Sequence, residues 1–443
     1  MTWMQMLPRF RRASESLAEM ADRESWDRDR IAAFQLERIN RVWKHARQSV
    51  PFYQAHRTGA EFPDVFASLQ QYTDTVPVLD KQVVRQTPED FLSANAQSGC
   101  WHRTGGSTGD PMGVYWSNAA HREMLQCKYR SEQKFGLDIF HRKVFFWGHR
   151  GSYLPGWKGV LQRAQMPVID WLRNRLRVSA YQLGVDDLRE QLLRIQRFSP
   201  ASIYGYSSAV SLLAAASKET GIRIPSLKLA VLTAEPADEL ICRQTAADLG
   251  IAVAQEYGSV ECGVMAFSDP DGTLRLREDV NYVETLRRED GRYDIVVTVL
   301  NNPSFPLMRY RIEDVTDEPR NIPEYGFASI RNIAGRNNDV LVSRNGRTWH
   351  SMAIKHLFEN FDGVRRFRAH QHEDGSLTVL VETPERLMGG MQKGQSKGLL
   401  PDFQAVEKQL RQMLDGFPVT LEFTDKIEGN LAGKHRWIVS DHV

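Results

Sequence analysis

The chain has few cysteines, no long apolar run and no excess of either charge. Its four cysteines are scattered without CxxC spacing, which argues against a disulfide framework or a structural zinc site. No apolar run approaches the roughly 18 residues that a membrane-spanning helix needs. The basic, amphipathic start MTWMQMLPRFRRASE lacks the apolar centre of a signal peptide. With 57 Lys+Arg against 55 Asp+Glu, nothing favours a nucleic-acid or membrane partner, and we expect a cytoplasmic protein.

The length and composition are those of a large globular protein. At 443 residues the chain exceeds the size at which single cores stop growing, so two or more domains are expected. Hydrophobic residues make up 42% of the chain, which is ample for sizeable cores.

Hydrophobic periodicity changes along the chain. Residues 1 to about 75 are predicted to be helical, with apolar residues at helical spacing until Pro51 stops a helix. The run 144–147 is predicted to be a strand. From about residue 185, helices that stop at Gly221 and Gly250 alternate with apolar runs, which is typical of βα units around a parallel sheet. After Gly258, alternating residues predict antiparallel strands, with a hairpin turn at 290–291.

The last hundred residues have a different texture. They predict a hairpin at 340–350, a helix at 351–361, two strands within 367–382, a helix at 403–414 and a final strand. We therefore predict an α/β (mixed α+β) fold with two domains. Residues 1–334 form a large domain with βα units, a parallel-containing sheet and antiparallel strands, and residues 335–443 form a small, mobile α+β domain.

The segment Arg103–Gly113, RTGGSTGDPMG, is the most informative stretch. Its glycines accept unusual φ angles and have no side chain, so backbone N–H groups and hydroxyls can reach a phosphate. No GK[ST] follows them, so this is not a Walker A loop. Strand-like residues on both sides predict a loop between two strands. Taken alone, the segment is equally compatible with a glycine-rich surface loop.

Five further segments accompany this loop. They are Thr233–Pro236, Gln255–Gly263, Phe305–Val315, Gly335–Val340 and Asn430–Arg436. Together, the six segments resemble the ordered signature motifs of adenylate-forming enzymes, which include acyl-CoA synthetases and luciferases. The closer likeness is to the phenylacetate–CoA ligase branch and its CapK-like relatives. The resemblance covers most of the chain, from residue 50 to Lys434.

The resemblance implies an ATP site with a magnesium ion. The glycine-rich loop would hold the β- and γ-phosphates, Tyr257 would stack on adenine, and Asp314 would bind the ribose hydroxyls. Glu261 would hold Mg²⁺, an ion that prefers such hard oxygen ligands near polyphosphate. Lys434 would bridge the attacking carboxylate and the α-phosphate. The implied nucleotide-binding residues are Thr104, Gly105, Gly106, Ser107, Thr108, Gly109, Ala234, Glu235, Pro236, Tyr257, Gly258, Ser259, Asp314 and Arg336.

Five of the six segments also have a purely structural interpretation, and three depart from the family pattern. Thr233–Pro236 is compatible with a turn at the end of a strand, and Glu261 with a solvated surface glutamate. Phe305–Val315 is compatible with a charged strand edge, and Asn430–Arg436 with a surface turn. Val260 stands where the family usually has a phosphate-binding threonine, beside Ser259. Ile312-Glu313 replaces Thr-Gly, and Asn338 replaces an aspartate at the hinge between the domains.

An acid pocket is predicted next to the nucleotide. Its candidate residues are Trp147, His149, Tyr204, Tyr206, Ser207 and Gly263. Aromatic and apolar groups dominate, which favours an aryl or other hydrophobic carboxylic acid. His149 is equally compatible with an ordinary buried histidine.

These residues lead to three functional hypotheses. The first is ATP-dependent activation of a carboxylic acid to an acyl-adenylate, with release of pyrophosphate and transfer to coenzyme A. The second keeps the adenylation but transfers the acyl group to an amine, a hydroxyl or a carrier-protein thiol. The third is a nucleotide-binding protein with a degenerate site, which the retained Glu261, Asp314, Arg336 and Lys434 argue against. The acid and the oligomeric state, a homodimer included, stay open.

Overall fold

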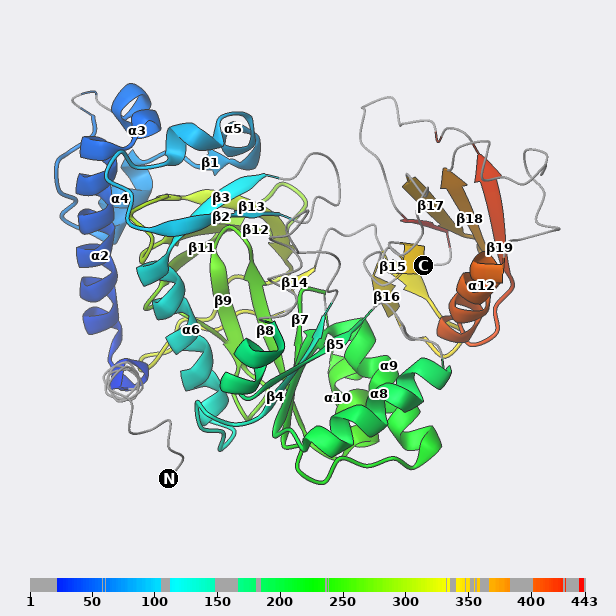
Figure 1. The fold of residues 1–443 in the computed structure, drawn as a ribbon. Coiled ribbons are helices and arrows are strands. Elements are labelled where there is room, and N and C mark those ends of the chain that lie inside the picture. The colour runs from blue at the N-terminus through cyan, green and yellow to red at the C-terminus, as the bar shows by residue number, and fades with distance from the viewer. Residues whose placement is uncertain are drawn as a thin grey trace. The chain divides into compact units, whose positions relative to one another are not determined.

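Figure 1 shows the computed structural model, in which helices and sheets alternate along most of the chain. It describes residues 22–57, 59, 61–104, 112–147, 166–180, 185–235, 237, 239–331, 333–334, 340–346, 348–350, 354, 357–358, 366–382, 401–424, 427 and 438–441. These residues form two compact units. The first draws on 1–106, 110–140 and 254–335, and the second on 107–109, 141–253 and 336–443.

Helices of the first unit come mainly from the N-terminal third. They are η2 (Arg23–Ser25), α2 (Arg28–Ser49), α3 (Pro51–His56), α4 (Leu69–Thr75), α5 (Lys81–Gln86), η3 (Pro88–Phe91) and α6 (Asn118–Gln133). Asp27 caps α2 by accepting a hydrogen bond from the Arg30 amide at 2.8 Å. The apolar stripe that includes Ile39 and Trp43 is buried, and Pro51 begins the next helix. The predicted helical start is thus confirmed over its described part, whereas the sequence reasoning missed α6.

The strands of the first unit are mostly antiparallel. One sheet has the order β1-β13-β12-β11, with β14 against β13. Its members are β1 (Leu79–Asp80), β11 (Asn281–Arg287), β12 (Tyr293–Val299), β13 (Tyr310–Thr316) and β14 (Ile333–Ala334). The predicted hairpin turn is present, with Gly291 at φ +84. The other strands are β2 (Gly99–Arg103), β3 (Gly113–Ser117), β8 (Ala252–Ser259), β9 (Gly263–Ser268) and β10 (Leu274–Leu276).

A buried charge network joins α6 to the segment before β11. Arg130 donates to Asp279 at 2.7 Å, and both side chains are almost fully buried. Burial alone would raise the pKa of Asp279, but the guanidinium groups of Arg130 and Arg277 hold that pKa below its usual range. Asp279 is therefore a carboxylate whose charge contributes to the stability of the fold.

The second unit contains the predicted βα units (Figure 1). Its parallel strands have the order β7-β6-β4-β5. They are β4 (Lys143–Trp147), β5 (Arg175–Ser179), β6 (Ser202–Tyr206) and β7 (Leu229–Thr233), with helices α8 (Val185–Phe198), α9 (Ser207–Thr220) and α10 (Glu239–Leu249). Gly221 and Gly250 follow α9 and α10 with φ near +70, as the predicted helix stops require.

The C-terminal segment has its own apolar core, which includes Leu341, Val379 and Leu410. Its strands are β15 (Val340–Val342), β16 (Thr348–His350), β17 (Arg366–Gln371), β18 (Leu377–Glu382), β19 (Val419–Thr424) and β20 (Ile438–Ser440), with helix α12 (Pro401–Met413). The four-stranded sheet has the order β19-β18-β17-β20. Two strands, β19 and β20, stand where the pattern predicted one. Most of the predicted helix 351–361 lies outside the described residues.

The predicted mixed α/β class is confirmed, because parallel and antiparallel sheets occur together with helices. Within the described ranges no helix combines the length and hydropathy needed to cross a membrane.

Candidate active site

The glycine-rich loop joins β2 and β3, which pair as antiparallel strands. Residues Gly105–Gly109 lie outside the described part of the chain, but the base of the loop is defined. The Thr104 amide donates to the Met112 carbonyl at 3.0 Å, and the Met112 amide donates back to the Thr104 hydroxyl at 3.0 Å. Thr104 thus closes the loop, and the prediction of a loop between two strands is confirmed.

The turn between β8 and β9 carries Ser259, Glu261 and Gly263. Gly263 has φ +67, and a Cβ atom on it would lie 2.7 Å from Met124 Sδ. A Cβ atom on Gly258 would lie 2.7 Å from the Gly263 carbonyl oxygen. Both glycines are therefore needed for the tight β8–β9 turn. The Ser259 hydroxyl accepts from the Cys262 amide at 3.0 Å, so it already stabilises this turn.

Glu261 lies in the β8–β9 turn and forms a buried ion pair. Its Oε1 is 2.9 Å from Lys81 Nζ, and the two side chains are 4% and 9% exposed. The Tyr310 hydroxyl donates to the same oxygen at 3.3 Å. Lys81 reaches this place because β1 pairs in parallel with β13, with Leu79 opposite Tyr310, and α5 begins at Lys81. The carboxylate proposed for metal binding therefore has a positive partner within the protein.

The surroundings of Glu261 disfavour further negative charge. Burial and the neighbouring Glu261 carboxylate raise the pKa of the Tyr310 hydroxyl and of the Cys262 thiol. Tyr310 therefore remains a hydrogen-bond donor, and Cys262 remains a neutral thiol that is unsuited to act as a nucleophile.

Tyr257 and Asp314, which lie 57 positions apart, form a hydrogen bond. The Tyr257 hydroxyl donates to Asp314 Oδ2 at 2.9 Å. Burial and the Asp314 charge raise the pKa of the phenol well above its usual value, so it stays protonated. The strand pairing of β12 with β13 is irregular just before Asp314, where Glu313 has φ +70. Such irregularities in a strand change the direction of nearby side chains, and this one lies directly before Asp314, whose carboxylate accepts the hydrogen bond from Tyr257.

In the second unit, three predicted pocket residues form an aromatic cluster at the ends of β4 and β6. Trp147 stacks on Tyr206 with ring centroids 4.2 Å apart, and on Tyr204 at 5.8 Å. Parallel strands that end side by side present such groups together, and ligands of open α/β sheets bind at these carboxyl ends.

The segment after β7 is tied to the start of α9. The Ser208 amide donates to the Glu235 carboxylate at 2.8 Å, and the Ser207 hydroxyl donates to the Glu235 carbonyl at 3.1 Å. Glu235 thus caps the start of helix α9. Ala234 has φ +65, a strained value for a residue other than glycine.

Several predicted site residues lie outside the described part of the chain. They are Gly105, Gly106, Ser107, Thr108, Gly109, His149, Pro236, Arg336 and Lys434.

The structure also adds Lys81 to the candidate site, which sequence reasoning missed. A lysine at the start of a short helix has no motif of its own, and only the pairing of β1 with β13 places it beside Glu261. Tyr310 lay inside the Phe305–Val315 segment, but its hydrogen bond to Glu261 could not be read from the sequence.

Relatives of the chain were found among known proteins, although no protein-family model matches it. Protein CapK of Staphylococcus aureus is 24% identical over 275 residues, which are 61% of this chain and 60% of CapK. Phenylacetate-coenzyme A ligase of Escherichia coli K12 is 24% identical over 391 residues, which are 81% of this chain and 83% of that enzyme. The Pseudomonas putida enzyme of the same name is 23% identical over 377 residues, 79% of this chain and 80% of that enzyme.

Solved structures show the same fold. The crystal structure of 2-hydroxyisobutyryl-CoA ligase in the postadenylation state, in complex with 2-HIB-AMP, matches with a TM-score of 0.59 at 17% identity. The match covers 95% of this chain and 91% of that enzyme. The six ordered motifs, the relatives and this fold agree. The relatives and the fold support the adenylate-forming superfamily, in the branch of phenylacetate–CoA ligase and CapK, and the named relatives indicate an AMP-forming acid–thiol ligase.

Proposed function

We propose that this protein activates a hydrophobic carboxylic acid with ATP and transfers the acyl group to coenzyme A. The observation that carries the proposal is the hydrogen bond between Tyr257 and Asp314, with Glu261 four positions further along. This contact joins two of the six motifs through the side chains to which the resemblance assigns adenine and ribose.

The proposed reaction has two steps. A carboxylate oxygen attacks the α-phosphorus of ATP, the bond to the bridging oxygen breaks, and pyrophosphate leaves. The sulfur of coenzyme A then attacks the acyl carbon, the bond to the AMP oxygen breaks, and AMP leaves. The first step involves little proton transfer, so catalysis depends on positioning and on neutralising charge. We assign the cation that bridges the attacking carboxylate and the α-phosphate to Lys434.

Glu261 fits a magnesium ligand. It is a buried hard-oxygen donor, and in this structure its charge is balanced by the Lys81 ammonium at 2.9 Å. A carboxylate that already requires a cation can exchange one for another, and Mg²⁺ is commonly held by one or two carboxylates plus substrate phosphates. When bound, the ion neutralises the negative charge of the polyphosphate. We propose that Lys81 keeps Glu261 neutralised and in place until Mg·ATP binds.

The cluster Trp147, Tyr204 and Tyr206 supports an apolar, flat acid. Aromatic rings bind such a group by burying its apolar surface and by stacking on it, and the part of the acid that they contact needs no charge. Several relatives are phenylacetate–CoA ligases, in agreement with this class of acid. We propose that Ala234 borders the adenine through its backbone, because the Glu235 carboxylate is engaged in capping α9.

We also propose that residues 335–443 act as a lid that rotates between the two half-reactions. Support comes from the separate core of this segment and from the position of Arg336 and Lys434 near its two ends.

An ATP–pyrophosphate exchange assay over a panel of aryl and aliphatic acids tests the proposal. We expect exchange that depends on an aryl or other hydrophobic acid, and AMP with an acyl-CoA once coenzyme A is added. Glu261→Gln should lower the exchange rate about 10²–10³-fold, whereas the exposed control Glu289→Gln should not change it. ATP binding without exchange for any acid would refute an enzyme of this kind. Exchange followed by transfer to an amine and not to coenzyme A would refute the assigned acceptor.

A further inference from the structure

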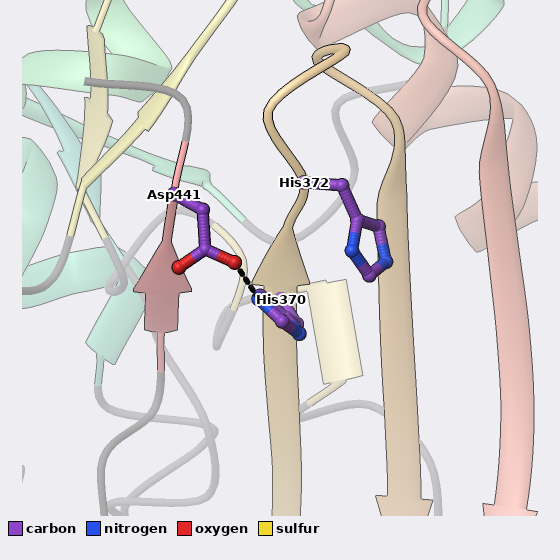
Figure 2. A group of neighbouring side chains, drawn as sticks. All are labelled: His370, His372 and Asp441. Carbon is purple, nitrogen blue, oxygen red and sulfur yellow. Dashed lines mark hydrogen bonds and ion pairs between the residues drawn. The ribbon is translucent and has the colours of Figure 1, made fainter.

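Three side chains with metal-binding donor atoms converge at one end of the C-terminal sheet. They are His370 in β17, His372 just after it, and Asp441 just after β20. Their donor atoms all lie within 4.8 Å of one another. Figure 2 shows the Asp441 carboxylate directed at the His370 ring, with the His372 ring beside it. We propose that these three residues form a binding site for a divalent transition-metal ion of the Zn²⁺ type.

The strand register explains why these residues meet. β17 and β20 pair in parallel, with His370 opposite Val439 and Gln371 opposite Ser440. One residue further along both strands, His372 lies level with Asp441, and the Asp441 amide donates to the Gln371 carbonyl at 2.9 Å. Because side chains alternate along a strand, His370 and His372 share one face. The backbone therefore holds the three donors together without help from a ligand.

The distances suit a metal ion after small side-chain rotations. Asp441 Oδ2 lies 2.6 Å from His370 Nε2, and the two imidazole rings are 4.4 Å apart. Ligands of tetrahedral Zn²⁺ lie about 2.0–2.2 Å from the ion and hence about 3.3 Å from one another. An ion between His370 Nε2 and Asp441 Oδ2 would replace their hydrogen bond. These two atoms would then need to move apart by less than about 1 Å.

His372 is already oriented by a neighbour. Its Nε2 is 2.9 Å from the Thr378 hydroxyl on β18, which leaves Nδ1 as the nitrogen for the ion. Such a second hydrogen bond fixes the ring and its tautomer, as is usual for histidines that bind metals. Thr378 is thus a positioning residue of the proposed site.

The donor set determines which ions fit. Two imidazoles and one carboxylate match Zn²⁺, Co²⁺ or Ni²⁺, whereas Mg²⁺ and Ca²⁺ prefer oxygen ligands only. The side chains of His370 and Asp441 are 39% and 50% exposed, so an ion can enter from solvent and keep a water as its fourth ligand.

Binding would fasten the last strand of the chain. β20 is three residues long and pairs with β17 at three positions. An ion held by His370, His372 and Asp441 would link the two strands through side chains as well as the backbone. Because the ion binds only the folded arrangement, it would raise the stability of the C-terminal segment.

The experiment uses the full-length chain without a histidine tag, stripped of metal by a chelator. Co²⁺ is titrated and followed by its visible absorption, and Zn²⁺ is titrated by calorimetry. We expect one ion per chain, a tetrahedral Co²⁺ spectrum and a Zn²⁺-dependent rise in the unfolding temperature. His370→Ala, His372→Ala and Asp441→Asn should each weaken binding at least ~10-fold, and Thr378→Val should weaken it less. His56→Ala, an exposed histidine on α3, is the control and should bind as the parent does.

Circular dichroism of each variant without metal establishes that it is folded. Equal affinity in the parent and in a His370→Ala/His372→Ala double variant would overturn the proposal. Weak binding of several ions per chain, unaffected by any of these substitutions, would also overturn it.

Discussion

Replacing Lys81 by methionine tests the electrostatic design of the candidate site. The substitution keeps an unbranched side chain of similar length and removes its charge. Among the described residues, the Glu261 carboxylate is then left buried with the Tyr310 hydroxyl at 3.3 Å as its hydrogen-bond donor. Removing one partner of a buried ion pair typically costs about 3–5 kcal/mol, because the remaining charge is uncompensated. We therefore expect Lys81→Met to lower the free energy of unfolding by about 3 kcal/mol at pH 7 without ligand.

A double-mutant cycle separates the ion pair from simple loss of packing. Glu261→Gln removes the other charge, and the double variant should be more stable than the sum of the two single losses predicts, by at least ~1.5 kcal/mol. The exposed pair Arg41–Glu37 on α2 is the matched control, and Arg41→Met should change stability by less than about 0.5 kcal/mol. Denaturant unfolding followed by circular dichroism measures all of these variants.

Ligand binding provides the second measurement. If Mg·ATP supplies the cation that Lys81 otherwise provides, Mg·ATP should raise the melting temperature of Lys81→Met more than that of the parent. Full additivity in the double-mutant cycle would refute the coupling of Lys81 with Glu261. An equal or smaller ligand-induced rise in Lys81→Met would refute the exchange of one cation for another.

Three further predictions concern other parts of the fold. Tyr257→Phe removes the hydroxyl that donates to Asp314 and should weaken ATP binding by about 1–3 kcal/mol, measured by calorimetry; unchanged affinity would dissociate this contact from the nucleotide. Lys434→Ala should lower pyrophosphate exchange about 10²–10³-fold with ATP affinity nearly intact, and an unchanged exchange rate would remove Lys434 from the first step. The pKa of Asp279 is lowered in the folded protein, so its stabilising charge is present above the unfolded pKa of about 4 and is lost as the pH falls through the folded pKa. Stability should therefore decline below about pH 4, and Asp279→Asn should flatten this decline; an equally steep acid limb in that variant would contradict the assignment.

Much of the architecture followed from local patterns. The stripe of α2, the glycines that end α9 and α10, and the β11–β12 hairpin all depend on residues close in sequence. Such features were predictable because periodicity, capping and turn chemistry act over a few positions. Helix α6 was missed, because its buried side chains include the charged Lys128, Arg130 and Glu132, which obscure an apolar stripe.

The sequence by itself determined the mixed α/β class, the order of the motifs and the family that they resemble, because each motif is a short run of residues. Only the tertiary structure decided how those motifs are partnered. Strand pairing brings Lys81 to Glu261, a hydrogen bond joins Tyr257 to Asp314, and Glu235 caps the helix that precedes it. No local pattern encodes these contacts, because they depend on which distant strands lie side by side and on which charges become buried together.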